Sequence, residues 1–313
     1  MESVSLDTLT FDHPAASRPA RFGAMLSLPM QAASPSSCMV ILTSSAGVQR
    51  HREHFYAQAL NEAGIAALIV DSFGGRGVRR TVADQTLVSA AQMEGDAFAA
   101  LAWLRSDPRI DPGRIGIMGV SKGGGASLAA AIAVRQKWRR GFPHLFDLHV
   151  AICPGATAQH RDPTTHGRPI FFMLAARDDY TPVPLAIEYA ERMRAAGNRA
   201  IKVKVYGGAH HGWESLGPVF DIKDAENWSC CRNYIEDDGR HFVVAAGRAM
   251  PEPEYQAWAR EHCVTRGARA GGGTEDLRRR ATSDLIAFLQ DHGFGDAGAL
   301  VAKQPQAAPI RVD

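Results

Sequence analysis

Short apolar segments alternate with helical segments along most of the chain, and this alternation limits the possible folds more than any other feature. Apolar runs predict strands over residues 39–42, 65–70, 115–118, 149–153, 170–174 and 201–205. The intervals have helical spacing or composition over residues 51–63, 86–104, 124–135 and 184–196, and a last helix spans 275–290. Apolar strands that alternate with helices form a mostly parallel sheet covered on both faces. We therefore predict one α/β domain over residues 1–313, with its chemistry at the carboxyl ends of the strands.

Composition and charge exclude several classes of protein. The chain has 313 residues, of which 45% are hydrophobic and 22% charged, so it can bury a large core and is not intrinsically disordered. The formal net charge of +2 implies no strong attraction to nucleic acid or to an anionic membrane. No apolar run reaches the roughly 18–20 residues that a membrane-spanning helix needs. The N-terminus lacks the basic start of a signal peptide, so we expect a cytoplasmic protein, and the sequence is compatible with a homodimer.

The segment before the last helix interrupts this rhythm. About 65 residues separate the last helix from the preceding strand, whereas a usual connection has about a dozen residues or fewer. The segment is rich in aromatic residues, which argues against disorder. These are Trp213, Phe220, Trp228, Tyr234, Phe242, Tyr255 and Trp258. We interpret residues 214–273 as a folded insertion that is either a lid or an inert surface excursion, and residues 303–313 as a loose tail.

One pentapeptide has the pattern of a nucleophile on a tight turn. Gly119-Val120-Ser121-Lys122-Gly123 follows a predicted strand and opens a predicted helix. Small flanking residues let the helix approach the strand, and the serine hydroxyl then projects above the sheet edge. The helix N-terminus beneath it stabilises developing negative charge. The pentapeptide alone is a weak signal, but its place between strand and helix makes Ser121 a candidate nucleophile.

A serine hydroxyl needs a base, and the base needs an acid that orients it. On a sheet of this kind the order along the chain should be serine, acid and histidine, with each partner just after a later strand. Asp178 and His211 each follow a predicted strand in this order. Spacing alone leaves Asp179 and His210 as alternatives, although we favour Asp178 and His211. Together with Ser121 they predict a catalytic triad.

Backbone N–H groups can hold the oxyanion that forms when such a serine attacks a carbonyl. The first donor should be the N–H of Lys122, which follows the nucleophile, and the second should come from a loop after an earlier strand. The loop at residues 43–47 is small and ends in glycine, so we predict Ala46 or Gly47 as the second donor.

Several of these motifs together resemble the dienelactone hydrolase family of α/β-hydrolases. The resemblance lies in residues 119–124 (Gly-Val-Ser-Lys-Gly-Gly), in Asp178 with Pro182, in His211-Gly212-Trp213 and in residues 71–77 (Asp-Ser-Phe-Gly-Gly-Arg-Gly). It covers residues 20–213 and the last helix. The resemblance implies an α/β-hydrolase fold, with Asp178 and His211 as the acid and the base.

The resemblance also sets expectations for the substrate. Well-known dienelactone hydrolases have a cysteine nucleophile where this chain has Ser121, which implies a broader esterase-like member. Arginines bind the substrate carboxylate in those enzymes, so Arg76 is a candidate here, with a salt-bridged surface arginine as the alternative. Tyr180 and Trp213, close to the acid and the base, are further candidate substrate contacts. Triad chemistry needs no cofactor.

The five cysteines form no metal motif. Cys38 and Cys153 lie in apolar runs and are expected in the core. Cys230 or Cys231 could pair with Cys263, although a cytoplasmic compartment disfavours a disulfide. Neither a Cys-x-x-Cys nor a His-Glu-x-x-His pattern is present, so we expect no metal.

These observations predict a serine hydrolase that cleaves a small-molecule carboxylic ester or lactone through an acyl-enzyme. A peptidase or acyltransferase with the same triad is the closer alternative. A non-catalytic binding protein on the same scaffold is the more distant one.

Overall fold

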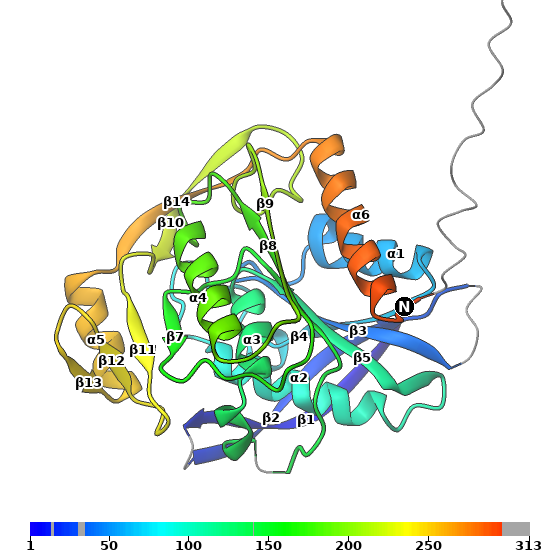
Figure 1. The fold of residues 1–313 in the computed structure, drawn as a ribbon, viewed down its shortest axis with the longest axis horizontal. Helices are drawn as coiled ribbons and strands as arrows, with labels where there is room; N and C mark the ends of the chain where they lie inside the picture. The colour runs from blue at the N-terminus through cyan, green and yellow to red at the C-terminus, as the bar shows by residue number, and fades with distance from the viewer. Residues whose placement is uncertain (14–15, 31–34, 140, 296–313) are drawn as a thin grey trace, which may run out of the picture.

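A mostly parallel sheet of eight strands forms the centre of the fold (Figure 1). The computed structural model describes residues 1–13, 16–30, 35–139 and 141–295, so the predicted tail at 303–313 lies outside the described residues. In spatial order the strands are β1 (Glu2–His13), β2 (Ala16–Ser27), β4 (Ala66–Asp71), β3 (Ser36–Leu42), β5 (Ile110–Val120), β6 (His149–Ile152), β8 (Ile170–Ala175) and β9 (Ile201–Tyr206). All neighbours from β4 to β9 are parallel, and β2 runs antiparallel to both β1 and β4. The predicted α/β class is confirmed.

Helices cover both faces of this sheet, because alternate residues of the buried strands point to opposite sides. The main helices are α1 (Phe55–Glu62), α2 (Ala90–Leu104), α3 (Lys122–Ala131), α4 (Val183–Ala195) and α6 (Glu275–Asp291). Met39 and Ile41 of β3 pack in the apolar cluster that α1 and α6 cover. Their neighbours Val40 and Leu42 pack on the other face, against α2 and α3. Helix α4 covers this second face beside β8.

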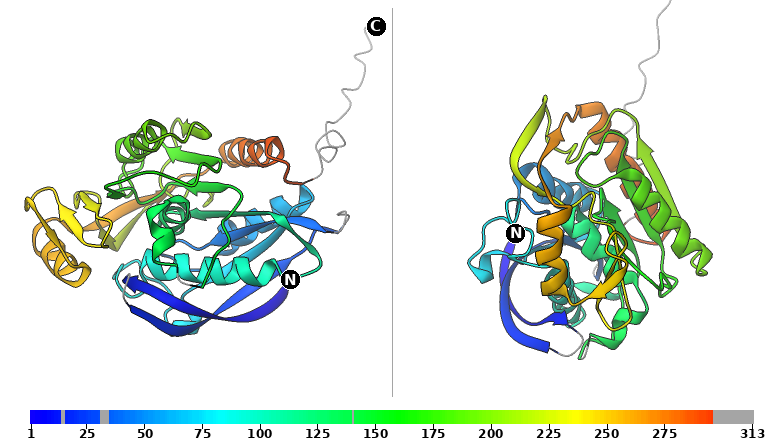
Figure 2. Two further views of the ribbon diagram at one scale, coloured as in Figure 1. Left: turned by 60° about the horizontal axis from the view of Figure 1, so that its bottom comes forward. Right: turned by 90° about the vertical axis from the view of Figure 1, so that its left-hand side faces the viewer.

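Strand β1 and its hairpin pairing with β2 were not predicted from the sequence. Figure 2 shows the hairpin curving beneath α2, and Leu6 of β1 belongs to the same buried cluster as Met93 of α2. Helix α2 also begins later than predicted, at Ala90. Ser89 and Gln92 form a capping box there, in which each side chain accepts the backbone N–H of the other residue. Residues 77–89 therefore form a connection that lies at the carboxyl edge of the sheet.

Residues 214–273 contain a two-stranded ribbon and an outer unit (Figure 1). The ribbon pairs β10 (Val219–Asn227) with β14 (Thr265–Gly271). The outer unit contains β11 (Asn233–Ile235), β12 (His241–Val243), β13 (Arg248–Met250) and helix α5 (Glu252–His262). Its strands extend a sheet that includes β7 (Ala158–His160) from the main domain. None of the helices in the described part of the chain is long and apolar enough to cross a membrane.

A disulfide between Cys231 and Cys263 joins the start of this outer unit to the end of α5. It is one of the two bridges that the sequence left open, and Cys230 remains an exposed free thiol. We expect the Cys231→Ser/Cys263→Ser double variant to lose about 3 kcal/mol of unfolding free energy, because the bridge closes a loop of 32 residues. Thermal and urea unfolding, with limited proteolysis of the outer unit, measure this loss. The matched control, Cys230→Ser, should unfold like the wild type, and equal stability of all three proteins would contradict the prediction.

Candidate active site

Ser121 lies on a strained turn between β5 and α3. Its backbone has φ 58° and ψ −115°, in a region that residues with a side chain rarely adopt. Two glycines make the turn possible. A Cβ atom on Gly119 would lie 2.3 Å from the carbonyl carbon of Gly123, and one on Gly123 would lie 2.5 Å from the Thr43 oxygen. The turn therefore brings α3, β5 and the end of β3 into backbone contact around Ser121.

Asp178 and His211 form a hydrogen-bonded pair after β8 and β9. His211 Nδ1 donates to Asp178 Oδ2 at 2.8 Å, and the two side chains are 8% and 0% exposed. The other carboxylate oxygen, Oδ1, accepts the backbone N–H groups of Tyr180 and Thr181 at 2.9 and 2.8 Å. With its proton on Nδ1, the imidazole presents Nε2 as an acceptor.

The structure does not place the two alternatives, Asp179 and His210, in such a pair. Asp179 forms a solvent-facing ion pair with Arg269 at 2.7 Å. His210 is buried, and its Nδ1 has no hydrogen-bond partner among the described residues. The geometry thus separates Asp178 from Asp179 and His211 from His210, which sequence spacing could not do.

Electrostatics keep the Asp178 carboxylate ionised. Burial acts to raise the pKa of Asp178, but the charge and hydrogen bond of His211 and the bonds from Thr181 outweigh it and hold the pKa below its usual value. Cys153 lies beside the pair, with its Sγ within 4.8 Å of a carboxylate oxygen of Asp178 and of a ring nitrogen of His211. Burial and the neighbouring Asp178 raise the pKa of the Cys153 thiol well above its usual value. This cysteine is therefore a neutral thiol at physiological pH.

Ser121 and His211 both lie at the carboxyl edge of the sheet, after β5 and β9, but no hydrogen bond joins their side chains. Among the described residues, no hydrogen bond of the Ser121 hydroxyl is present. The backbone of Ser121 is tied to the site, because its N–H donates to the Ile152 oxygen at 2.8 Å. The backbone oxygen of Cys153, the residue after Ile152, accepts a hydrogen bond from the Thr181 hydroxyl at 3.1 Å. Catalytic hydrogen bonds often tighten only when substrate is bound.

The loop after β3 differs from the prediction for the second oxyanion donor. The Ala46 N–H donates to Ser44 Oγ at 3.2 Å, and the Gly47 N–H donates to the Ser44 oxygen at 3.0 Å. Both predicted donors are therefore used inside the turn. Within the described chain, the backbone N–H of Ser45, the residue before Ala46, has no acceptor. The first predicted donor, the N–H of Lys122, opens α3, where backbone N–H groups have no acceptor within the helix.

The Lys122 side chain has a position that no sequence motif indicated. Its Nζ donates to three neutral oxygens of the 77–89 connection, Thr81 Oγ1, Gln85 O and Val88 O, each at 2.8 Å. Burial lowers the pKa of Lys122 to about 7, although nearby carboxylates oppose this change. The side chain thus ties the residue after Ser121 to the connection above it.

Two predicted substrate contacts are corrected by the structure. Arg76 is not free for a substrate, because its guanidinium donates to both carboxylate oxygens of the buried Asp96, at 2.7 and 2.9 Å. Trp213 is fully buried and packs against Tyr206 in the core. Tyr180, the third candidate, does lie at the site, with its ring 5.1 Å from the His211 ring in an edge contact. The sequence showed these side chains at strand ends but not their partners.

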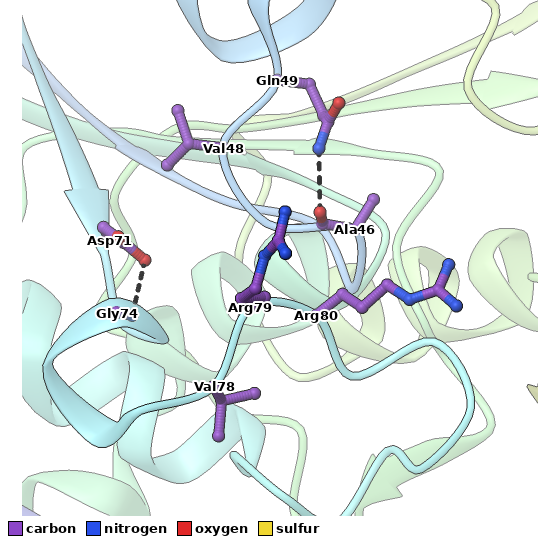
Figure 3. A pocket seen from close by; sticks show the side chains of 8 residues that line it. All are labelled: Ala46, Val48, Gln49, Asp71, Gly74, Val78, Arg79 and Arg80. Carbon is purple, nitrogen blue, oxygen red and sulfur yellow. Dashed lines mark hydrogen bonds between the residues drawn. The ribbon is translucent and has the colours of Figure 1, made fainter.

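A cavity of about 620 Å³ lies beside the loop at residues 43–47 (Figure 3). Ala46, Val48, Val78, Arg79 and Arg80 are among its lining residues, whereas Ser121, Asp178 and His211 are not. Arg80 pairs with Asp224 at 2.9 Å. Arg79 has no ion pair among the described residues, so it is a free cation next to the loop.

Buried charges hold the loop at residues 43–47 and the residues that follow it in place. Arg52 Nη1 donates to Ser44 Oγ at 2.5 Å, and Glu53 Oε2 accepts the Gln49 N–H at 2.7 Å. Arg52 Nε also lies 3.6 Å from Oε2 of Glu214, which follows His211 by three residues. The sequence shows this charged cluster only as part of a predicted helix. Its signal is weak because the partners are remote in sequence.

The segment that leads from the ribbon back to the main domain is hydrogen-bonded to the loop that contains His211. The Gly271 N–H donates to the His211 oxygen at 2.9 Å, and the Gly273 N–H donates to the Ser215 oxygen at 3.0 Å. A Cβ atom on Gly273 would lie 1.9 Å from the Trp213 oxygen, so only glycine permits this approach. We call residues 270–273 the return segment.

The order of the strands, the serine turn after β5 and the acid and histidine after β8 and β9 are those of an α/β-hydrolase. Residues 22–226 match the model of the dienelactone hydrolase family, and the chain belongs to this family. This places it among hydrolases of the ester type. None of the curated proteins compared with the chain matches it.

Solved structures show the same fold at low sequence identity. Esterase 2 of Thermogutta terrifontis, phosphonylated by cyclosarin, has a TM-score of 0.57 and 15% identity, over 88% of this chain and 90% of that chain. Its form phosphoramylated by tabun has a TM-score of 0.56, with the same identity and coverage. A Klebsiella pneumoniae protein assigned to the dienelactone hydrolases has a TM-score of 0.51 and 17% identity, over 68% of this chain and 89% of that chain.

Proposed function

We propose that this protein is a serine hydrolase that cleaves a small-molecule carboxylic ester or lactone through an acyl-enzyme. The observation that carries the proposal is the buried hydrogen bond between Asp178 and His211 at the sheet edge where Ser121 occupies its strained turn. An acid, an imidazole and a serine in this chain order are the parts that nucleophilic acyl transfer requires.

In the proposed reaction Ser121 Oγ attacks the carbonyl carbon while His211 Nε2 takes the hydroxyl proton. Asp178 holds the imidazole in the tautomer with its proton on Nδ1 and stabilises the imidazolium. The N–H groups of Lys122 and Ser45 hold the oxyanion. His211 then gives its proton to the leaving alkoxide, or to the ring oxygen of a lactone. Water, deprotonated by the same imidazole, releases the acid and restores the serine.

Two observations favour serine over cysteine as the nucleophile. Ser121 occupies the turn itself, whereas Cys153 lies after β6 and is kept protonated by its surroundings. The similar esterase 2 is modified by cyclosarin and tabun, reagents that phosphorylate activated serines. We therefore expect an organophosphorus reagent to modify Ser121.

A fluorophosphonate probe and a matched pair of substrates test this function. We expect the probe to label the purified protein once, with the mass added on the peptide that contains Ser121. We also expect hydrolysis of a small aryl ester or lactone with a kcat/KM at least about 100-fold above that of the matching aryl amide, because the arylamine of the amide is a poorer leaving group than the alkoxide or phenolate of the ester. Labelling without any ester turnover would instead indicate an acyltransferase that needs another acceptor, and no labelling would indicate an inert scaffold.

A further inference from the structure

Gln85, in the 77–89 connection, forms hydrogen bonds to four separate parts of the candidate site. Its side-chain oxygen accepts the Ser45 hydroxyl at 2.9 Å, and its side-chain nitrogen donates to the Tyr180 hydroxyl at 2.9 Å. Its backbone oxygen accepts Lys122 Nζ at 2.8 Å, and its backbone N–H donates to Glu226 Oε2 at 2.7 Å. One half-buried residue therefore uses every polar group that it has.

The two partners of the carboxamide come from two different loops of the candidate site. Ser45 lies in the loop that supplies the second oxyanion donor. Tyr180 follows the acid and presents its ring to His211. Because the Tyr180 hydroxyl donates to the Glu226 oxygen at 3.2 Å, it accepts from the amide, and this fixes which way the amide points. The carboxamide thus bridges the oxyanion loop and the loop of the acid.

The backbone of Gln85 is itself held on both sides. Lys122 anchors it from the turn of the nucleophile. Glu226, which is 1% exposed, anchors it from the ribbon and also accepts Trp228 Nε1 at 3.3 Å and Arg260 Nε at 3.1 Å. A residue fixed through its backbone can hold its side-chain partners at a constant separation, as a site for acyl transfer requires.

We propose that Gln85 is a positioning residue of the hydrolytic site, whose carboxamide sets the separation between the oxyanion loop and the loops of the acid and base. The inference rests on the proposed function. The bridge acts on geometry that matters in the transition state, so its removal should lower kcat and leave KM almost unchanged.

The test starts from Gln85→Leu, which keeps the side-chain volume and removes both amide hydrogen bonds. We expect kcat for the aryl ester to fall by about 10- to 100-fold, with KM changed by less than about threefold. The melting temperature should fall by less than about 5 °C, since only two partly exposed hydrogen bonds are lost. Gln58→Leu is the matched control, because among the described residues the Gln58 amide bonds only Glu62 on the exposed face of α1, and its loss should leave kcat unchanged.

Two conservative variants show whether Gln85 acts through its two partners, and in the wild-type background they do so even if leucine at position 85 impairs folding. Ser45→Ala and Tyr180→Phe each remove one end of the bridge, and Tyr180→Phe keeps the ring beside His211. We expect each to lower kcat in the wild-type background and to have no further effect in the Gln85→Leu background. Independent, multiplying effects would overturn the proposal, as would a wild-type kcat in Gln85→Leu or a loss confined to KM.

Failure of the proposed function has a different signature. A wild-type protein that neither reacts with the fluorophosphonate probe nor hydrolyses esters would overturn the function, and this inference with it. An active, probe-labelled wild type beside an equally active Gln85→Leu variant would overturn the role of Gln85 alone.

Discussion

Replacing Ser121 with alanine should reduce kcat for an ester substrate by about 10³- to 10⁶-fold, because the acyl-enzyme can no longer form. The fold should persist, since the turn is held by the close approach of Gly119, Gly123 and the end of β3 rather than by the hydroxyl. Steady-state kinetics of the purified variant, with a melting curve to verify folding, measure the effect. Fluorophosphonate labelling should disappear in parallel.

The matched control is the other nucleophilic side chain at the site. Cys153→Ala removes a thiol that lies beside the acid and the base but remains protonated. We expect this variant to keep its activity within about tenfold of the wild type, because it changes the packing and the thiol contact beside Asp178 but leaves the hydrogen bond between Asp178 and His211. A Ser121→Ala protein with most of its turnover, beside an inactive Cys153→Ala protein, would move the nucleophile to the cysteine.

Asp178→Asn should give the second largest loss, with kcat lower by about 10³- to 10⁴-fold. The asparagine oxygen can still accept the backbone N–H groups of Tyr180 and Thr181, so the loop should keep its conformation. Its NH₂ group, however, would face His211 Nδ1 and favour the opposite tautomer, with the proton on Nε2. The imidazole would then have no free acceptor for the serine proton. Measurement of kcat on a small aryl ester tests this expectation.

The neighbouring aspartate provides a direct comparison. Asp179→Asn breaks only the solvent-facing pair with Arg269, and such pairs contribute little. We expect this variant to keep kcat within about threefold of the wild type. The assignment of the acid would have to be revised if the two substitutions had equal effects, or if Asp179→Asn were the more damaging.

The central sheet and the positions of Asp178 and His211 at its edge were predictable because each depends on local sequence. Buried parallel strands are continuous apolar runs, and polar residues just after them must lie at one edge of the sheet. The turn at Ser121 was equally predictable, because its strain requires small neighbours such as Gly119 and Gly123. By contrast, the strands from β10 to β14 could not be predicted, because they are short or exposed and their residues show no clear alternation.

The partners of individual polar side chains could not be predicted. Arg76 seemed available to a substrate because its partner, Asp96, lies twenty residues later on a helix. Ala46 and Gly47 were reasonable oxyanion donors until the turn at Ser44 was seen to use their N–H groups. Gln85 carries no motif at all, since its importance comes from four partners that are remote in sequence. Such roles depend on tertiary contacts rather than on patterns.

The bonds between the return segment and the loop of His211 make residues 214–273 a poor candidate for modular exchange. A transplanted ribbon of another length would shift Gly271 and Gly273, and with them His211 and Ser215, whose backbone oxygens they bond. Natural or laboratory variation should therefore be tolerated in the outer unit, beyond Trp228, far more readily than at the base of the ribbon. Libraries that seek new substrate preferences should diversify the outer unit and keep the β10–β14 ribbon unchanged.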